Sequence, residues 1–263
     1  MFIFRTRRCA AARRLPLMAF LLGLATGACG AGSSELLVSA ASGLDPAMRE
    51  IARAFESETG VPVRLNFAST GQLAHQIERG APVDVFVAAD GSYLDILDED
   101  GLLLRGSRRT FARGRLALLS PPKGPFVQRL EELADSAVEL VAMAHPTHAP
   151  YGLAARRALE RAGIWAAVES KLVITESVEQ SYRYVIGGNV DAALVANSLV
   201  SEGDAHVILV DTAFYGMLDH EIAVTHSAPR ESAARRFAAF LFNPASQAIL
   251  RRHGMIPMEE EAE

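Results

Sequence analysis

Residues 61–88 read VPVRLNFASTGQLAHQIERGAPVDVFVA, and this stretch indicates the fold class. Val61–Phe67 alternates between apolar and polar residues as a strand does, and Asp84–Ala88 is a second short apolar run. Between them Leu73 and Ile77 stand at helical spacing. A strand, a helix and a further strand in this order predict parallel pairing in a sheet that is covered by helices.

The same alternation extends in both directions from this stretch. Further strands are expected at Leu36–Ala41, Arg115–Ser120, Glu139–Ala144, Leu172–Ile174, Ala192–Ala196, Val207–Val210 and Glu221–Thr225. Further helices are expected from Asp45 to Gly60 and at Tyr93–Asp98, Gly152–Ala162, Val178–Ile186, Pro229–Phe242 and Ser246–Arg252. The pattern predicts an α/β fold with mixed, mostly parallel sheets flanked by helices. We expect two lobes, 35–111 with 211–259 and 112–210, joined by crossing strands near residues 110 and 210.

Composition excludes several classes of protein. Half of the 263 residues are hydrophobic and 22% are charged, so the chain has the apolar surface that a disordered protein lacks. The formal net charge is −5, and no basic stripe of the kind that binds nucleic acid occurs. The two cysteines, Cys9 and Cys29, both lie near the N-terminus, so no disulfide or cysteine metal cluster is expected in the rest of the chain.

The first 28 residues have the pattern of a signal peptide. They contain five arginines and no acidic residue, followed by the apolar run Leu15–Ala25 and small residues. Removing them leaves 21 basic and 31 acidic residues, a net charge of −10. The stretch LATGACG, 24–30, resembles a bacterial lipobox, although Thr26 stands where a larger aliphatic residue is usual. We therefore expect a periplasmic lipoprotein anchored through Cys29, with simple cleavage and release as the alternative.

Motifs for catalysis are weak in this sequence. It contains no G-x-S-x-G nucleophile elbow, no P-loop and no dinucleotide-binding fingerprint. His145 and His148 are three residues apart, but no cysteine or nearby acid completes a metal-ligand set. His75 is expected on the surface, and Asp84 and Asp90 are expected at strand ends as turn or cap residues.

A recurring junction stands out instead, in which a strand is followed by small or hydroxyl residues and then by the start of a helix. Four such junctions occur, at Ala41-Ser42-Gly43, Ala68-Ser69-Thr70-Gly71, Ala149-Pro150-Tyr151-Gly152 and Glu176-Ser177-Val178. The first N–H groups of a helix lack intrahelical partners and carry partial positive charge, so they bind anions without lysine or arginine. One junction alone is an ordinary helix cap. Several of them facing one another predict an anion site between two lobes.

At these residues the sequence resembles the molybdate-binding proteins of bacterial ABC transporters, which have the type II periplasmic binding-protein fold. The resemblance runs over most of residues 36–256. It rests on VSAAS at 38–42 with PAM at 46–48, FASTGQLAHQIERGAPVDVF at 67–86, HPTHAPYG at 145–152, and ESV at 176–178 ahead of GNVDA at 188–192.

The resemblance implies a binding protein and not an enzyme, which captures molybdate or tungstate between its lobes and delivers it to a permease in the inner membrane. The implied ligands of the oxyanion are Ser42 and Thr70, through hydroxyl and N–H, and Tyr151 and Val178, mainly through backbone N–H. No cofactor and no direct cation ligand are implied, and a monomer is expected. Some members add a tyrosine hydroxyl where this chain has Ala196, so Asn197 or Ser198 would substitute or one donor would be missing.

Two other functions stay open at this point. One is a receptor for a different oxyanion or for a small organic acid. The other is an exported serine hydrolase that uses Ser42 or Thr70 as its nucleophile, although the motifs place no general base beside either residue.

Overall fold

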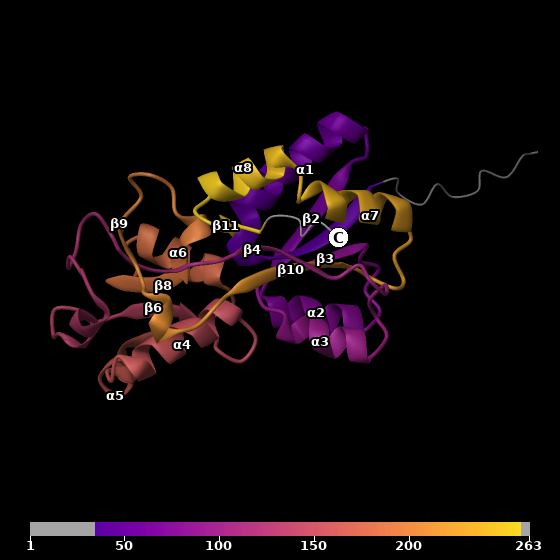
Figure 1. Cartoon of the computed structure of the whole chain (residues 1–263). Helices are drawn as coiled ribbons and strands as arrows, with labels where there is room; N and C mark the ends of the chain where they lie inside the picture. Colours follow the sequence, from indigo (N-terminus) through magenta and orange to yellow (C-terminus); the bar gives the residue numbers. More distant parts are fainter. Residues whose placement is uncertain (1–34, 259–263) are drawn as a thin grey trace, which may run out of the picture. The chain divides into compact units, whose positions relative to one another are not determined.

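The computed structural model describes residues 35–258 and contains two mixed β-sheets flanked by helices (Figure 1). The first sheet has the strand order β11-β4-β10-β3-β1-β2, and the second has the order β7-β6-β8-β5-β9. The strands of the first sheet are β1 (Leu36–Ala41), β2 (Val63–Ala68), β3 (Val85–Ala88), β4 (Arg109–Arg113), β10 (Asp219–Val224) and β11 (Ile256–Pro257). Those of the second are β5 (Leu116–Ser120), β6 (Val141–Ala144), β7 (Leu172–Thr175), β8 (Ala192–Ala196) and β9 (His206–Leu209).

Eight α-helices and five short 3₁₀ helices occur within the described residues. The α-helices are α1 (Asp45–Thr59), α2 (Thr70–Glu78), α3 (Ser92–Glu99), α4 (Pro150–Arg161), α5 (Trp165–Val168), α6 (Val178–Ile186), α7 (Glu231–Phe240) and α8 (Pro244–Arg252). The 3₁₀ helices are η1 (Ser42–Leu44), η2 (Leu130–Ala134), η3 (Glu169–Lys171), η4 (Asn197–Leu199) and η5 (Thr212–Phe214). None of the helices between residues 35 and 258 combines the length and the apolar character that crossing a membrane requires.

Helix boundaries follow local chemistry. Proline stands in the first turn of α1, α4 and α8, where its missing N–H costs nothing. Ser69 and Gln72 form a capping box at the start of α2, and Ser177 caps α6 by accepting the N–H of Gln180. Gly60 ends α1 with φ of 70°, a left-handed conformation that suits glycine.

Helices cover both faces of the first sheet, and strand β3 shows how (Figure 1). Val85 and Val87 of this strand pack into the core shared with α1 and α7, whereas Phe86 and Ala88 pack against α2 and α3. All four side chains are fully buried. A strand buried on both faces is a continuous apolar run, and this explains the sequence VFVA.

The expected α/β fold with two lobes is confirmed, but the sheets contain more antiparallel pairing than expected. Within residues 35–258, four strand pairings are parallel and five are antiparallel. The antiparallel pairings all involve β4, β5 or β10, the strands next to the points where the chain passes from one sheet to the other. A helical crossover returns the chain to a sheet in the same direction, whereas the two passages between the sheets have no α-helix and lead into β5 and β10, which run against their neighbours.

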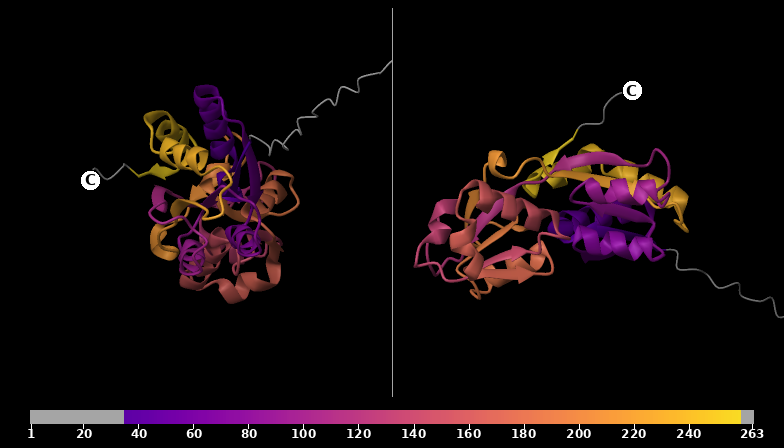
Figure 2. Two further views of the ribbon diagram at one scale, coloured as in Figure 1. Left: turned by 90° about the vertical axis from the view of Figure 1, so that its right-hand side faces the viewer. Right: turned by 90° about the horizontal axis from the view of Figure 1, so that it is seen from below.

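The chain passes between the sheets twice, once between β4 and β5 and once between β9 and β10 (Figure 2). Gly114 lies between β4 and β5, and its N–H donates to the carbonyl of Leu218, just before β10, at 2.8 Å. A side chain at Gly114 would place its Cβ 2.1 Å from the hydroxyl of Tyr151 and 2.5 Å from Nε2 of His220. Glycine is therefore required here by close approach.

The expected signal peptide and Cys29 lie outside the described residues.

Candidate functional site

Two of the four junctions lie side by side in the first sheet. Strand β1 ends at Ala41, directly before Ser42, and β2 ends at Ala68, two residues before Thr70. The two strands are parallel neighbours, and Ala41 lies opposite Ala68 in their register. Their carboxyl ends therefore bring the two hydroxyl residues to the same edge of the sheet.

The other two junctions are arranged in the same way in the second sheet. Strands β6 and β7 are parallel neighbours, with Ala144 opposite Thr175. The chain after β6 leads to the start of α4, where Tyr151 is the second helical residue, and the chain after β7 leads to Val178, the first residue of α6. The first N–H groups of a helix have no hydrogen-bond partner within the helix, and those of Tyr151 and Val178 are at such positions.

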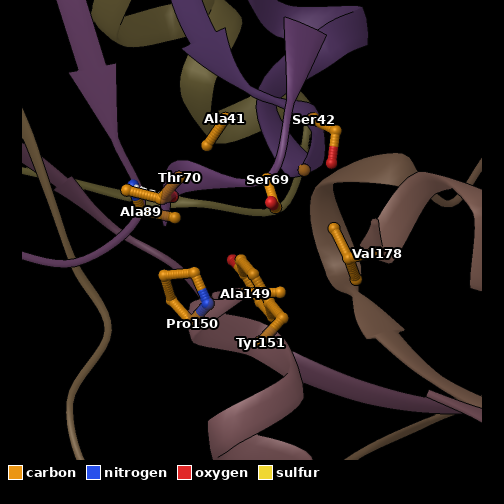
Figure 3. Close-up of a pocket in the computed structure, with 10 residues that line it drawn as sticks. Ala41, Ser42, Ser69, Thr70, Ala89, Ala149, Pro150, Tyr151 and Val178 are labelled. Carbon is orange, nitrogen blue, oxygen red and sulfur yellow. Dashed lines mark hydrogen bonds between the residues drawn. The ribbon is translucent and has the colours of Figure 1, made fainter. Parts of the chain in front are cut away.

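The structure brings all four residues expected at the anion site to one small cavity. Figure 3 shows Ser42 and Thr70 of the first sheet's junctions with Tyr151 and Val178 of the second's. The complete lining is Ala41, Ser42, Gly43, Ser69, Thr70, Ala89, Ala149, Pro150, Tyr151 and Val178. No aspartate, glutamate, lysine, arginine or histidine is among these residues. The space between these residues is about 210 Å³, including open solvent at its mouth.

Thr70 is held by a contact that leaves its hydroxyl hydrogen free. Its side chain is fully buried, and Oγ1 accepts the N–H of Ala89 at 3.3 Å. A hydroxyl that accepts one hydrogen bond retains its own hydrogen as a donor. Thr70 lines the cavity, and so does Ser42, whose exposed fraction is only 3%.

The side chain of Tyr151 is bonded elsewhere. Its hydroxyl lies 3.2 Å from Nε2 of His220 on β10, and both side chains are buried. Burial raises the pKa of Tyr151 well above its usual value and lowers the pKa of His220 to about 4. Both groups are therefore neutral near pH 7, and the contact joins α4 of the second lobe to β10 of the first without any charge.

Neither candidate substitute for the missing tyrosine hydroxyl lines the cavity. Asn197 donates from Nδ2 to the carbonyl of Gly254 at 3.2 Å, and Ser198 donates from Oγ to the carbonyl of Gly43 at 2.6 Å. Both side chains are thus occupied by contacts between the lobes. Ala196 is fully buried, and its Cβ lies 3.1 Å from where a Cβ on Gly43 would stand.

The remaining candidates have structural partners. The rings of His145 and His148 stack with centroids 4.7 Å apart, and in the described part of the chain no three histidine, cysteine or acidic side chains are grouped as metal ligands. His75 is exposed and lies 2.7 Å from a carboxylate oxygen of Glu78. Asp84 is buried and accepts the N–H of Leu37 and two donors of Arg230, and Asp90 accepts the N–H of Ser92 in a turn.

Ser69, His148 and Glu176 are arranged superficially like a hydrolytic triad, a grouping that the sequence did not indicate. Ser69 Oγ lies 3.0 Å from Nδ1 of His148, but Nε2 of that ring is 3.9 Å from the Glu176 carboxylate. That carboxylate already accepts a hydrogen bond from Gln72 at 3.0 Å. An orienting acid makes a hydrogen bond of about 2.6–3.2 Å to its base, so this grouping lacks the geometry of an activated nucleophile.

The chain belongs to the family of bacterial extracellular solute-binding proteins, whose sequence model matches residues 36–256. Molybdate-binding protein ModA of Azotobacter vinelandii is 31% identical over 239 residues, covering 89% of this chain and 94% of that protein. ModA of Rhodobacter capsulatus is 31% identical over 241 residues, covering 91% and 94%. The solved structure of the Azotobacter vinelandii periplasmic molybdate-binding protein matches with a TM-score of 0.80 at 28% identity, covering 84% of this chain and 98% of that chain. The chain is therefore an extracytoplasmic solute-binding protein.

Proposed function

We propose that this chain is the molybdate-binding subunit of an ABC transporter and delivers its ligand to permease subunits in the inner membrane. One observation carries the proposal. Four helix-start junctions, two from each sheet, line one small cavity that contains hydroxyls and no charged side chain. The proteins named for molybdate binding, which are similar over nearly the whole chain, support this choice of anion.

In this proposal Ser42 and Thr70 donate through hydroxyl and N–H, and Tyr151 and Val178 donate through backbone N–H. The two lobes that close on the anion are 35–111 with 211–259 and 112–210. The occupied hydroxyl of Tyr151 supports a backbone role for that residue. Partial charges at helix starts hold an anion locally, which suits a chain whose expected processed form has a net charge of −10 and gives no long-range attraction.

Calorimetry with molybdate, tungstate and sulfate tests the proposed function. We expect molybdate and tungstate to bind similarly, because the two oxyanions have equal charge and similar size. Sulfate is smaller, so we expect it to lose at least one of the hydrogen bonds that molybdate makes. Each hydrogen bond to a charged group that is lost costs about 1.5–3 kcal/mol, so sulfate should bind roughly tenfold more weakly or worse.

Two results would contradict this assignment. Absence of molybdate binding together with binding of an organic acid would assign the cavity to a different solute. Turnover of ester or phosphate substrates that is lost in Ser42→Ala or Thr70→Ala would indicate the hydrolase instead. We propose binding without turnover, because none of the cavity-lining residues offers a general base to either hydroxyl.

Lipid anchoring through Cys29 is a separate proposal. The lipobox-like stretch 24–30 supports it, and a tethered monomer would stay close to the permease that it supplies. Cys29→Ala should release the protein into the soluble fraction or leave its precursor uncleaved. Intact-mass measurement of the protein from its native host checks this, and an unmodified Cys29 in the processed chain would contradict it.

A further inference from the structure

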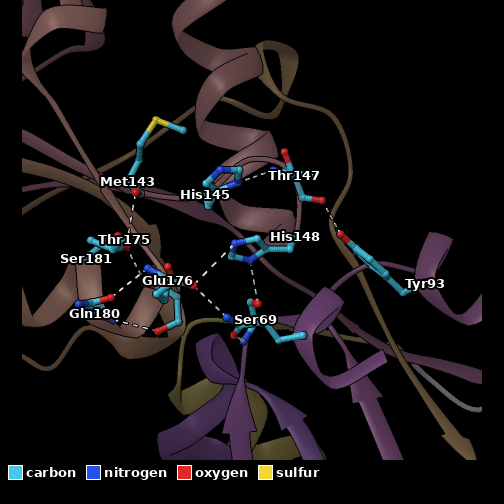
Figure 4. A network of polar contacts seen from close by, with 12 residues as sticks. Ser69, Tyr93, Met143, His145, Thr147, His148, Thr175, Glu176, Gln180 and Ser181 are labelled. Carbon is cyan, nitrogen blue, oxygen red and sulfur yellow. Dashed lines mark hydrogen bonds and ion pairs between the residues drawn. The ribbon is translucent and has the colours of Figure 1, made fainter. Parts of the chain in front are cut away.

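Direct polar contacts join the two lobes beside the cavity (Figure 4). Ser69 Oγ lies 3.0 Å from Nδ1 of His148, and the N–H of Gly71 donates to the carbonyl of His148 at 2.9 Å. Nearby, Tyr93 donates from its hydroxyl to the carbonyl of Thr147 at 2.8 Å, and Gln72 donates to Glu176. The first partners belong to α2, to its capping residue Ser69 or to α3, and the second partners belong to the segments that follow β6 and β7.

These contacts join the starts of two helices that face the cavity. Ser69 caps α2 and directly precedes Thr70, and His148 lies in the turn before α4, three residues before Tyr151. A hydrogen bond between Ser69 and His148 therefore fixes the distance between a proposed anion donor of one lobe and a proposed donor of the other. Neither Gly71 nor His148 lines the cavity itself.

The protonation of this contact follows from its partners. The hydroxyl of Ser69 accepts the N–H of Gln72 in the capping box and keeps its own hydrogen, which it donates to Nδ1 of His148 when that nitrogen carries no proton. Burial, and secondarily the stacked ring of His145, lower the pKa of His148. The ring is therefore neutral near pH 7, and the tautomer with its proton on Nε2 accepts from Ser69 through Nδ1.

The absence of a side chain at Gly71 is necessary for this approach. A Cβ there would lie 2.9 Å from both the Cβ and the carbonyl oxygen of His148, and 2.9 Å from the Tyr93 hydroxyl. Gly71 has ordinary helical backbone in α2, and alanine is a better helix former than glycine. The Gly71→Ala substitution therefore favours the helical conformation of α2 but places a methyl group against the turn that contains His148.

We propose that Ser69, Gly71 and His148 form a rim latch that holds the lobes closed and positions the oxyanion donors, without the side chain of Gly71 or His148 touching the anion. The proposal rests on the proposed function. It assigns Gly71 and His148 as positioning residues whose effect on affinity arises from the closed state. A contact that stabilises the closed state slows dissociation, because the anion leaves only after the lobes open.

Three substitutions of His148 test the hydrogen bond. His148→Ala should weaken molybdate binding roughly 2- to 10-fold and speed dissociation, which stopped flow measures. His148→Asn should restore the parent rate, because the asparagine amide stands near the position of Nδ1 and can accept from Ser69. His148→Gln should not restore it, because its amide stands farther out. Equal dissociation rates in the parent and His148→Ala would overturn the latch.

Gly71→Ala tests the close approach and should weaken binding on the order of 10- to 100-fold, as overpacking at a tight contact does. Gln76→Ala, on an exposed position of the same helix, is the matched control and should bind like the parent.

The distance between the lobes gives a readout without ligand. Spin labels are placed at exposed Glu99→Cys and Arg157→Cys in a full chain whose Cys9 and Cys29 are serine.

The label distance in ligand-free Gly71→Ala should be longer than in the ligand-free parent, and it should stay longer with molybdate present. An unchanged distance together with unchanged affinity would overturn the latch. The two proposals fail in different ways. A parent that does not bind molybdate contradicts the proposed function, while the ligand-free distances still test the latch. A parent that binds molybdate no more tightly than Gly71→Ala and His148→Ala contradicts the latch alone.

Discussion

Thr70→Ala is expected to weaken molybdate binding by roughly 10- to 150-fold, because a hydrogen bond to a charged group contributes about 1.5–3 kcal/mol. The geometry of Thr70 supports an effect of this size. Its Oγ1 already accepts the N–H of Ala89, so the only hydrogen of the hydroxyl is available for an oxyanion. The side chain is fully buried, so water cannot replace the lost donor without entering the cavity. Calorimetric titration of parent and variant measures the change.

Two further substitutions separate the hydroxyl from the shape of the side chain. Thr70→Ser keeps the hydroxyl and should bind molybdate nearly as the parent does. Thr70→Val keeps the shape without the hydroxyl and should lose as much affinity as Thr70→Ala. Both hydroxyl-free variants also leave the buried N–H of Ala89 without its acceptor, which should lower the free energy of unfolding by about 1–3 kcal/mol. Parent-like affinity in Thr70→Val would remove this residue from the anion site.

The location of the cavity was predictable because it depends on local sequence. A strand that ends before a hydroxyl residue and a capped helix is visible in a single stretch, as at Ala68-Ser69-Thr70. Parallel pairing of neighbouring strands then places consecutive junctions together, and the registers of Ala41 with Ala68 and of Ala144 with Thr175 agree with that expectation. The proportion of parallel pairing was overestimated, since the return of the chain through β10 is not visible in local periodicity.

The contacts between the lobes could not be predicted from the sequence. Ser69 and His148 are 79 residues apart, and Ser198 and Gly43 are 155 residues apart. Neither pair belongs to a motif, and a histidine two residues before a helix has no special meaning until the opposing helix is placed. The sequence also does not show that Asn197 and Ser198, which follow the end of β8, donate to backbone carbonyls of the other lobe and not to the anion.

Acidification is expected to destabilise the fold through His220, between about pH 6.5 and pH 4. Burial lowers the pKa of this side chain to about 4 in the folded protein, only partly offset by the charges of Asp219 and Asp90. Its pKa in the unfolded chain is about 6.5. Between these values the unfolded state binds more protons than the folded state, so stability rises with pH. The contribution is fully present above pH 6.5 and is lost as the pH falls through 4.

The size of this loss follows from the difference between the two pKa values. One pKa unit corresponds to about 1.4 kcal/mol, so His220 should cost about 3 kcal/mol of unfolding free energy by pH 4. Solvent does not screen this effect, because the ring of His220 is fully buried. Its Nδ1 has no hydrogen-bond partner among residues 35–258, so no acceptor stabilises an added proton there.

His220→Gln isolates this contribution from that of the carboxylates, which also titrate in acid. The glutamine amide can still donate to the hydroxyl of Tyr151, but it does not titrate, so the variant should lose about 3 kcal/mol less than the parent between pH 7.5 and pH 4. His148→Asn is the control for the other histidine with a lowered pKa. It should lose nearly as much unfolding free energy as the parent between the two pH values, because His148 is partly exposed. Urea unfolding at both pH values measures the difference. An equal loss of stability in the parent and in His220→Gln would contradict this prediction. His220 would then be protonated in the folded protein beside a partner that compensates its burial, and the contact between α4 and β10 would not be uncharged.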